Sequence, residues 1–107
     1  MELDLVRGTL DLLILKTLSW GPLHGLAVMR SIEQITREQL QIEEGALYPA
    51  LHRMEESGWV SAKWVITENK RRARVYEITA AGRKQLKEAE GRWRAVTAAV
   101  GQVLQRA

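Results

Sequence analysis

Residues 44–57 carry side chains whose types suit contact with a nucleic acid. If they form a helix, the residues on its outer side or flank are Tyr48, Pro49, His52, Arg53 and Glu56. Arginine pairs with guanine or a phosphate, and tyrosine and histidine can donate to phosphates or base edges. Free backbone N–H groups at Gly45 and Ala46, where the helix would begin, can face a further phosphate. We therefore predict a DNA-contacting side, the alternative being an ordinary exposed surface.

A second group of candidate DNA contacts consists of four cations, Lys70, Arg71, Arg72 and Arg74. From Trp59 onward the hydrophobic period changes to two, and residues 72–78 place Tyr76 and Ile78 on one face. Asn69 tolerates the left-handed conformation of a turn, so the segment is predicted to be a β-hairpin. Because cations so close together repel one another unless an anion is near, we expect this hairpin to contact DNA. The alternative is a solvated hairpin.

The net charge of +3 conceals an uneven distribution along the chain. Residues 1–58 hold 5 basic and 9 acidic side chains, a balance of −4, whereas residues 59–107 hold 11 basic and 4 acidic ones, a balance of +7. A basic block is what a polyanion-binding surface requires, although a solvated helix face gives the same count.

Two more helices must position the candidate DNA-contacting helix. Thr9 is expected to cap a helix over residues 10–19 that is apolar on more than one side. Such a helix in a small protein is expected to pack on its own core and also on a second subunit. Gly21 and Pro22 are stop signals, and residues 24–35 follow with helical periodicity.

A last helix is predicted from Ala80 almost to the C-terminus, with Thr79 as its cap. Its apolar residues recur in steps of three and four, the narrow seam of a coiled coil rather than the wider stripe of a helix that covers its own domain. A second copy of the chain would cover this seam. The residues predicted to form the dimer interface are Leu86, Ala89, Trp93, Val96, Val100 and Val103, with Leu10 and Leu13 of the first helix.

Length and composition exclude several other classes of protein. A chain of 107 residues is expected to be one domain with a single modest core. The absence of cysteine excludes disulfides, thiolate zinc sites and cysteine nucleophiles, and it favours the cytoplasm. The longest apolar run, residues 12–15, is far too short to span a membrane. Glu2 and Asp4 stand where a signal peptide would carry positive charge, so none is expected.

Candidate catalytic and metal-binding groups are few. His24 and His52 fall on different predicted helices and neither has a histidine partner four residues away, so we predict no metal site. The sequence shows no set of nucleophile, base and orienting group and no phosphate-binding loop, so we predict no enzymatic activity and no required cofactor.

Three helices, a basic hairpin and a long helix follow one another as in a winged helix-turn-helix, and four blocks of sequence resemble the PadR family of bacterial transcriptional regulators. The blocks are RGTLDLLIL at 7–15, GPLHG at 21–25, EGALYPALHRME at 44–55 and YEITAAG at 76–82. The resemblance covers nearly the whole chain, and the Gly-x-Leu-Tyr-Pro-x-Leu pattern within the third block is specific to that family among winged helices. Leu26 stands where the family commonly has tyrosine.

This resemblance implies a mainly α fold with a small β-hairpin. Residues 1–79 would form the winged helix-turn-helix DNA-binding domain and residues 80–107 a C-terminal dimerisation helix, as in the compact subfamily. The helix at 44–57 would enter the major groove, and the hairpin would be the wing. In the compact subfamily the last helix pairs with helices of a second subunit, and effectors bind at or near the dimer interface.

The function so implied is sequence-specific binding of double-stranded DNA by a homodimer on a near-palindromic operator, as a repressor released by a small effector. Trp93, in the middle of the seam, either packs the interface or lines a pocket for a flat aromatic or cationic effector. Two alternatives stay open: a winged-helix module that binds proteins without DNA, and a metal-responsive regulator.

Overall fold

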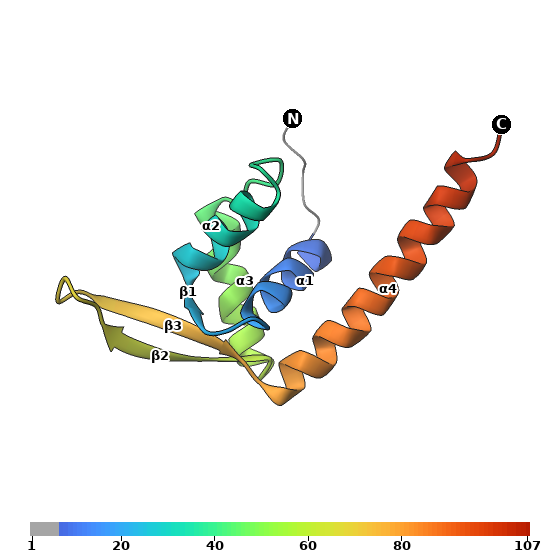
Figure 1. Ribbon diagram of the computed structural model, residues 1–107. Coiled ribbons are helices and arrows are strands. Elements are labelled where there is room, and N and C mark those ends of the chain that lie inside the picture. The colour runs from blue at the N-terminus through green and yellow to red at the C-terminus, as the bar shows by residue number, and fades with distance from the viewer. Residues whose placement is uncertain (1–6) are drawn as a thin grey trace.

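The computed structural model describes residues 7–107 and shows three packed helices, a β-hairpin on one side and one long helix that projects on the other (Figure 1). Glu2 and Asp4, on which the expectation about a signal peptide rests, lie outside the described residues. The elements in chain order are α1 (Arg7–Leu18), β1 (Leu23–His24), α2 (Gly25–Ile35), α3 (Glu44–Glu56), β2 (Val60–Ile66), β3 (Arg72–Ile78) and α4 (Ala80–Leu104).

The core lies between α1, α2, α3 and the base of the hairpin, because each of these elements presents an apolar face. In α2 the buried residues Val28 and Ile32 are one helical turn apart. Thr9 lies inside α1 and does not cap it, since that helix begins at Arg7. The largest side chains that are almost wholly inaccessible to solvent are Ile14, Leu15, Leu18, Val28, Leu47, Leu51 and Met54.

The sheet has three antiparallel strands in the order β1-β3-β2. The expected hairpin of β2 and β3 is present, and the fold class, a mainly helical winged helix-turn-helix, is confirmed with one strand added. That strand, β1, pairs Leu23 with Tyr76 and His24 with Val75. Two residues show no alternation of side chains, so sequence periodicity does not reveal it.

The turn of the hairpin differs from the prediction in one residue. Lys70, not Asn69, adopts the left-handed conformation, with φ of 59°. Thr67 stabilises this turn, because its backbone N–H donates to the carbonyl of Arg71 over 2.9 Å and its hydroxyl oxygen accepts from the Arg71 N–H over 3.3 Å.

Helix α4 begins at the predicted cap, because the Thr79 hydroxyl accepts a hydrogen bond from the Gly82 N–H over 3.0 Å. Gly82 is buried against Trp59, which precedes β2, and any side chain there would run into the carbonyl oxygen of Trp59. The C-terminal half of α4 extends away from the other elements (Figure 1). The radius of gyration is accordingly 15.4 Å, whereas a compact chain of this length has about 13 Å. Over residues 7–107, no helix combines the length and apolarity needed to span a membrane.

Candidate nucleic-acid interface

Helix α3 separates its two faces cleanly. Tyr48, Pro49 and His52 are exposed on the outer side, as the spacing predicted, and Gly45 and Ala46 are exposed at the start of the helix. The residues of α3 that are buried in the core are Leu47, Ala50, Leu51 and Met54. The Tyr48 side chain is 44% exposed. Its ring has room because Gly25 of α2 lies beside it: a Cβ on Gly25 would be 2.8 Å from the Tyr48 ring. The absence of a side chain at Gly25 therefore lets α2 pack closely against α3 beside the Tyr48 ring.

Arg53, although predicted to face DNA from the flank of α3, points toward α1. Its guanidinium donates to the Asp11 carboxylate over 2.7 Å, and the side chains are 32% and 20% exposed. This corrects the expectation of a free guanidinium at residue 53. A partly buried ion pair holds the arginine, so its charge is compensated within the chain.

The wing cations divide into two groups. Lys70, Arg71 and Arg72 are exposed on the distal part of the hairpin. Arg74 instead donates to the Glu55 carboxylate of α3 over 2.7 Å, which corrects the expectation that all four cations are free. Side-chain Nε of Arg74 is buried without a hydrogen-bond partner among the described residues. Arg74 therefore joins the hairpin to α3 rather than projecting from the wing.

Aromatic rings lie beside these arginines, a feature that the sequence pattern did not single out. The Arg72 guanidinium carbon is 4.5 Å from the centre of the Trp64 ring, and that of Arg74 is 5.7 Å from the same ring. Arg74 also lies 5.9 Å from the Tyr76 ring. Burial raises the pKa of the Tyr76 hydroxyl above its ordinary value of 10.0, and the charge of Arg74 acts in the opposite direction.

The two histidines have local partners. His24 caps α2, since its Nδ1 accepts from the Ala27 N–H over 3.2 Å. His52 Nε2 lies 2.8 Å from the carboxylate of Glu56 on the same exposed face. Within residues 7–107, no three histidine, aspartate or glutamate side chains gather closely enough to hold a metal ion.

The residues predicted to form a dimer interface fall into three groups. Leu10 and Leu86 are buried in the core of the single chain, and this corrects the expectation that they face a second copy. Leu13 and Ala89 are partly buried. The exposed residues, called here the apolar strip, are Trp93, Val96, Val100 and Val103.

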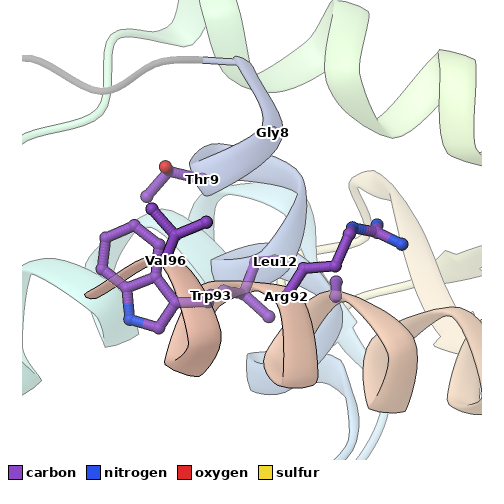
Figure 2. Close-up of a pocket in the computed structure, with 7 residues that line it drawn as sticks. Gly8, Thr9, Leu12, Arg92, Trp93 and Val96 are labelled. Atoms are coloured by element: carbon purple, nitrogen blue, oxygen red, sulfur yellow. The ribbon is translucent and has the colours of Figure 1, made fainter. Parts of the chain in front are cut away.

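A pocket of about 350 Å³ lies where the apolar strip meets α1, and its lining residues are Gly8, Thr9, Leu12, Ala89, Arg92, Trp93 and Val96. Figure 2 shows the Trp93 ring beside Val96, with Thr9 and Leu12 of α1 across from them. A second hollow of about 400 Å³ shares Leu12 and Trp93. The bridge from Lys16 to Glu90, at 3.3 Å, joins the two helices beside this second hollow.

The three-helix core, the antiparallel wing and the exposed outer side of α3 together define a winged helix-turn-helix protein. The chain belongs to the PadR-like family of transcriptional regulators, whose family model matches residues 14–88. The resemblance carried by the four sequence blocks is thus confirmed. Members of this family are regulators rather than enzymes, and membership implies DNA binding.

Several relatives agree with this assignment. A transcriptional regulator of Mycobacterium tuberculosis is 32% identical over 82 residues, which cover 77% of this chain and 73% of that protein. A transcriptional regulator from Clostridium thermocellum has a similar structure, with a TM-score of 0.83 at 30% identity over 90% of this chain and 93% of the other. A PadR family regulator from Eggerthella lenta gives 0.82 at 31% identity, over 94% and 86%.

Proposed function

We propose that the protein is a sequence-specific DNA-binding regulator in which α3 occupies the major groove and the wing contacts the flanking backbone. The observation that carries this proposal is the exposed pair Tyr48 and His52 on α3, on the same molecule as the exposed wing cations Lys70, Arg71 and Arg72. Tyrosine and histidine can hydrogen-bond to base edges, whereas lysine and arginine neutralise phosphates irrespective of sequence. Arg53 joins α3 to α1 through Asp11, and Arg74 joins the wing to α3 through Glu55, so these two ion pairs hold both DNA-contacting elements in place.

The proposed functional unit is a homodimer on a near-palindromic operator. Trp93 is 48% exposed and Val100 is 50% exposed, so a single chain leaves the apolar strip in water. A second copy offers the same strip and would bury both. A two-fold dimer would present two α3 helices to half-sites about one turn of DNA apart.

The proposed regulation is release of a repressor by a small aromatic effector in the pocket between α1 and α4. Trp93 supplies a flat aromatic surface there. Arg92 is the charged residue among the described lining residues. A cation would be repelled by this guanidinium, so the pocket favours a neutral or anionic aromatic compound over the cationic alternative.

A mobility-shift titration tests the proposal on DNA binding. The probes are the region upstream of the protein's own gene and a duplex of scrambled sequence, each with and without excess random competitor. We expect tighter binding to the upstream region, and we expect His52→Ala to reduce that preference. Arg71→Ala should weaken both complexes equally, because a phosphate contact carries no sequence information.

Lys87→Ala is the matched control, since Lys87 is an exposed cation on α4, outside the wing. Equal affinity of the native protein for both probes would contradict sequence-specific recognition. An intact dimer that binds neither probe would favour the protein-interaction module.

A further inference from the structure

We propose that Trp64 is the residue that positions Arg72 for contact with DNA. The inference rests on the proposed function, because it assumes that the wing meets a duplex. It adds a role for an uncharged side chain that the charge pattern of the hairpin does not single out.

The strand register places these residues on one face of the hairpin. Val60 is opposite Ile78, Ala62 is opposite Tyr76, and these pairs lie over the core. Two residues further from the core, Trp64 is opposite Arg74. Because side chains alternate along a strand, this is the same face, continued beyond the part that the helices cover.

The next pair outward is Ile66 opposite Arg72. Arg72 therefore reaches Trp64 diagonally, and its guanidinium carbon lies 4.5 Å from the centre of the ring. The ring is otherwise poorly covered, since Trp64 is 57% exposed. The indole is therefore not packed into the core, and its flat, electron-rich face meets the cation.

Arg74, Trp64 and Arg72 form a stack of which only the Arg74 end is held by an ion pair. Arg74, also within 5.7 Å of the Trp64 ring, is held by Glu55 of α3. Arg72 is exposed and forms no ion pair among the described residues. The stack thus runs from α3 through Arg74 and Trp64 to a guanidinium whose five donors are not used by any carboxylate of residues 7–107.

The consequence for binding is pre-organisation. A free arginine side chain loses rotamer freedom when it binds a phosphate or enters a groove, and this loss weakens association. Stacking on Trp64 restricts Arg72 before DNA arrives, while its donors stay accessible. Trp64 is therefore a positioning residue, and its effect should disappear when Arg72 is absent.

A double-mutant cycle tests the proposal. Trp64→Leu, Arg72→Ala and the double variant are titrated against a fluorescently labelled duplex of mixed sequence, at several salt concentrations. The full-length chain is used, and thermal unfolding checks that each variant is folded. We expect Trp64→Leu to weaken binding about two- to fivefold and to have no further effect in the Arg72→Ala background.

The salt dependence gives a readout that a merely structural role would not produce. Arg72→Ala should reduce the log-log slope by about 0.9, the value for one lost phosphate contact. Trp64→Leu should leave the slope unchanged, because the charge of Arg72 remains. Trp64→Phe, which keeps an aromatic face, should restore most of the affinity. Trp20→Leu is the matched control, since Trp20 is 62% exposed and lies outside the hairpin.

Two results would overturn the inference. Equal weakening by Trp64→Leu with and without Arg72 would mean that Trp64 acts on DNA by itself, and no weakening in either background would mean that the stack is irrelevant to binding. In both cases native binding with a normal salt slope would leave the proposed function standing. Failure of the native chain to bind any duplex would overturn the proposed function, and this inference with it.

Discussion

The guanidinium of Arg53 lies 2.7 Å from the carboxylate of Asp11 and joins α3 to α1 across 42 residues of sequence. The pair stabilises the domain, because it fixes the orientation of the DNA-facing helix α3 against α1. Asp11 is next in sequence to Leu12, which lines the pocket between α1 and α4 together with Thr9. One helix thus contacts both the candidate DNA-contacting element and the candidate effector site.

Breaking this pair should destabilise the fold. Asp11→Asn removes the negative charge and leaves the Arg53 guanidinium partly buried without compensation. We expect the free energy of unfolding to fall by about 1–2 kcal/mol and the midpoint of thermal unfolding to fall by several degrees.

The exposed contact between His52 and Glu56 provides the control for that experiment. These side chains are 70% and 67% exposed, and exposed pairs contribute little. Glu56→Gln should therefore leave the unfolding midpoint nearly unchanged. An equal loss in both variants would mean that the Asp11 contact has no special structural role.

Gly82 should not tolerate a side chain. The carbonyl of Trp59 accepts a hydrogen bond from the Thr79 N–H over 3.0 Å, and a Cβ on Gly82 would occupy the same space as that carbonyl oxygen. We expect Gly82→Ala to lower the free energy of unfolding by about 2 kcal/mol or more, measured by denaturant titration.

Gly91 in the same helix should respond in the opposite direction. Apart from its chain neighbours and the backbone of its own helix, no atom of residues 7–107 lies within 4 Å of the position that a Cβ on Gly91 would take. The seven-residue repeat places this residue opposite the apolar strip. Gly91→Ala is expected to raise the free energy of unfolding by about 0.5–1 kcal/mol. Stabilisation by both substitutions would show that Gly82 is not tightly packed.

The apolar strip should control association. Val100→Glu places a charge in the middle of the strip, where it would be buried between two copies without a partner. Sedimentation equilibrium should give twice the mass of one chain for the native protein and the mass of one chain for this variant. Ala98→Glu adds the same charge on the opposite side of α4 and should remain dimeric; loss of the dimer in both variants would point to a general effect of charge.

Trp93 should report on the pocket. A flat neutral or anionic aromatic compound that binds between α1 and α4 should quench part of the protein's fluorescence, because the Trp93 ring lines that pocket. Trp93→Leu should abolish the saturable part of the quenching, and Arg92→Ala should weaken binding of an anionic compound more than that of a neutral one. Saturable quenching that persists in Trp93→Leu would place the compound near another tryptophan.

Local signals in the sequence predicted much of the fold. Thr79 has the chemistry of a helix cap and is one. Gly58 follows α3 with φ of 79°, the left-handed conformation in which a glycine commonly ends a helix. Helical periodicity located α2 and α3, and alternation located the hairpin, because each pattern reflects which side of one element is buried.

Contacts between distant segments could not be predicted in the same way. Arg53 was assigned to the DNA-facing flank because helix geometry alone does not include Asp11, which lies on another helix. Arg74 was counted with the wing cations for the same reason, since Glu55 is its partner only after the hairpin packs on α3. The position of Trp64 beneath Arg72 depends on the strand register, which a single strand does not specify.

The projecting half of α4 has a consequence for dynamics. From residue 91 onward almost every residue is exposed, and the segment has little tertiary packing of its own. Helices shorter than about 12–15 residues are marginal in water when isolated, so a lone copy should fray there, and its amide hydrogens should exchange with solvent rapidly. In the proposed homodimer the same amides should exchange slowly, so the exchange rate in this segment should depend on protein concentration. Folding of the C-terminal half of α4 and dimerisation would then be one cooperative event.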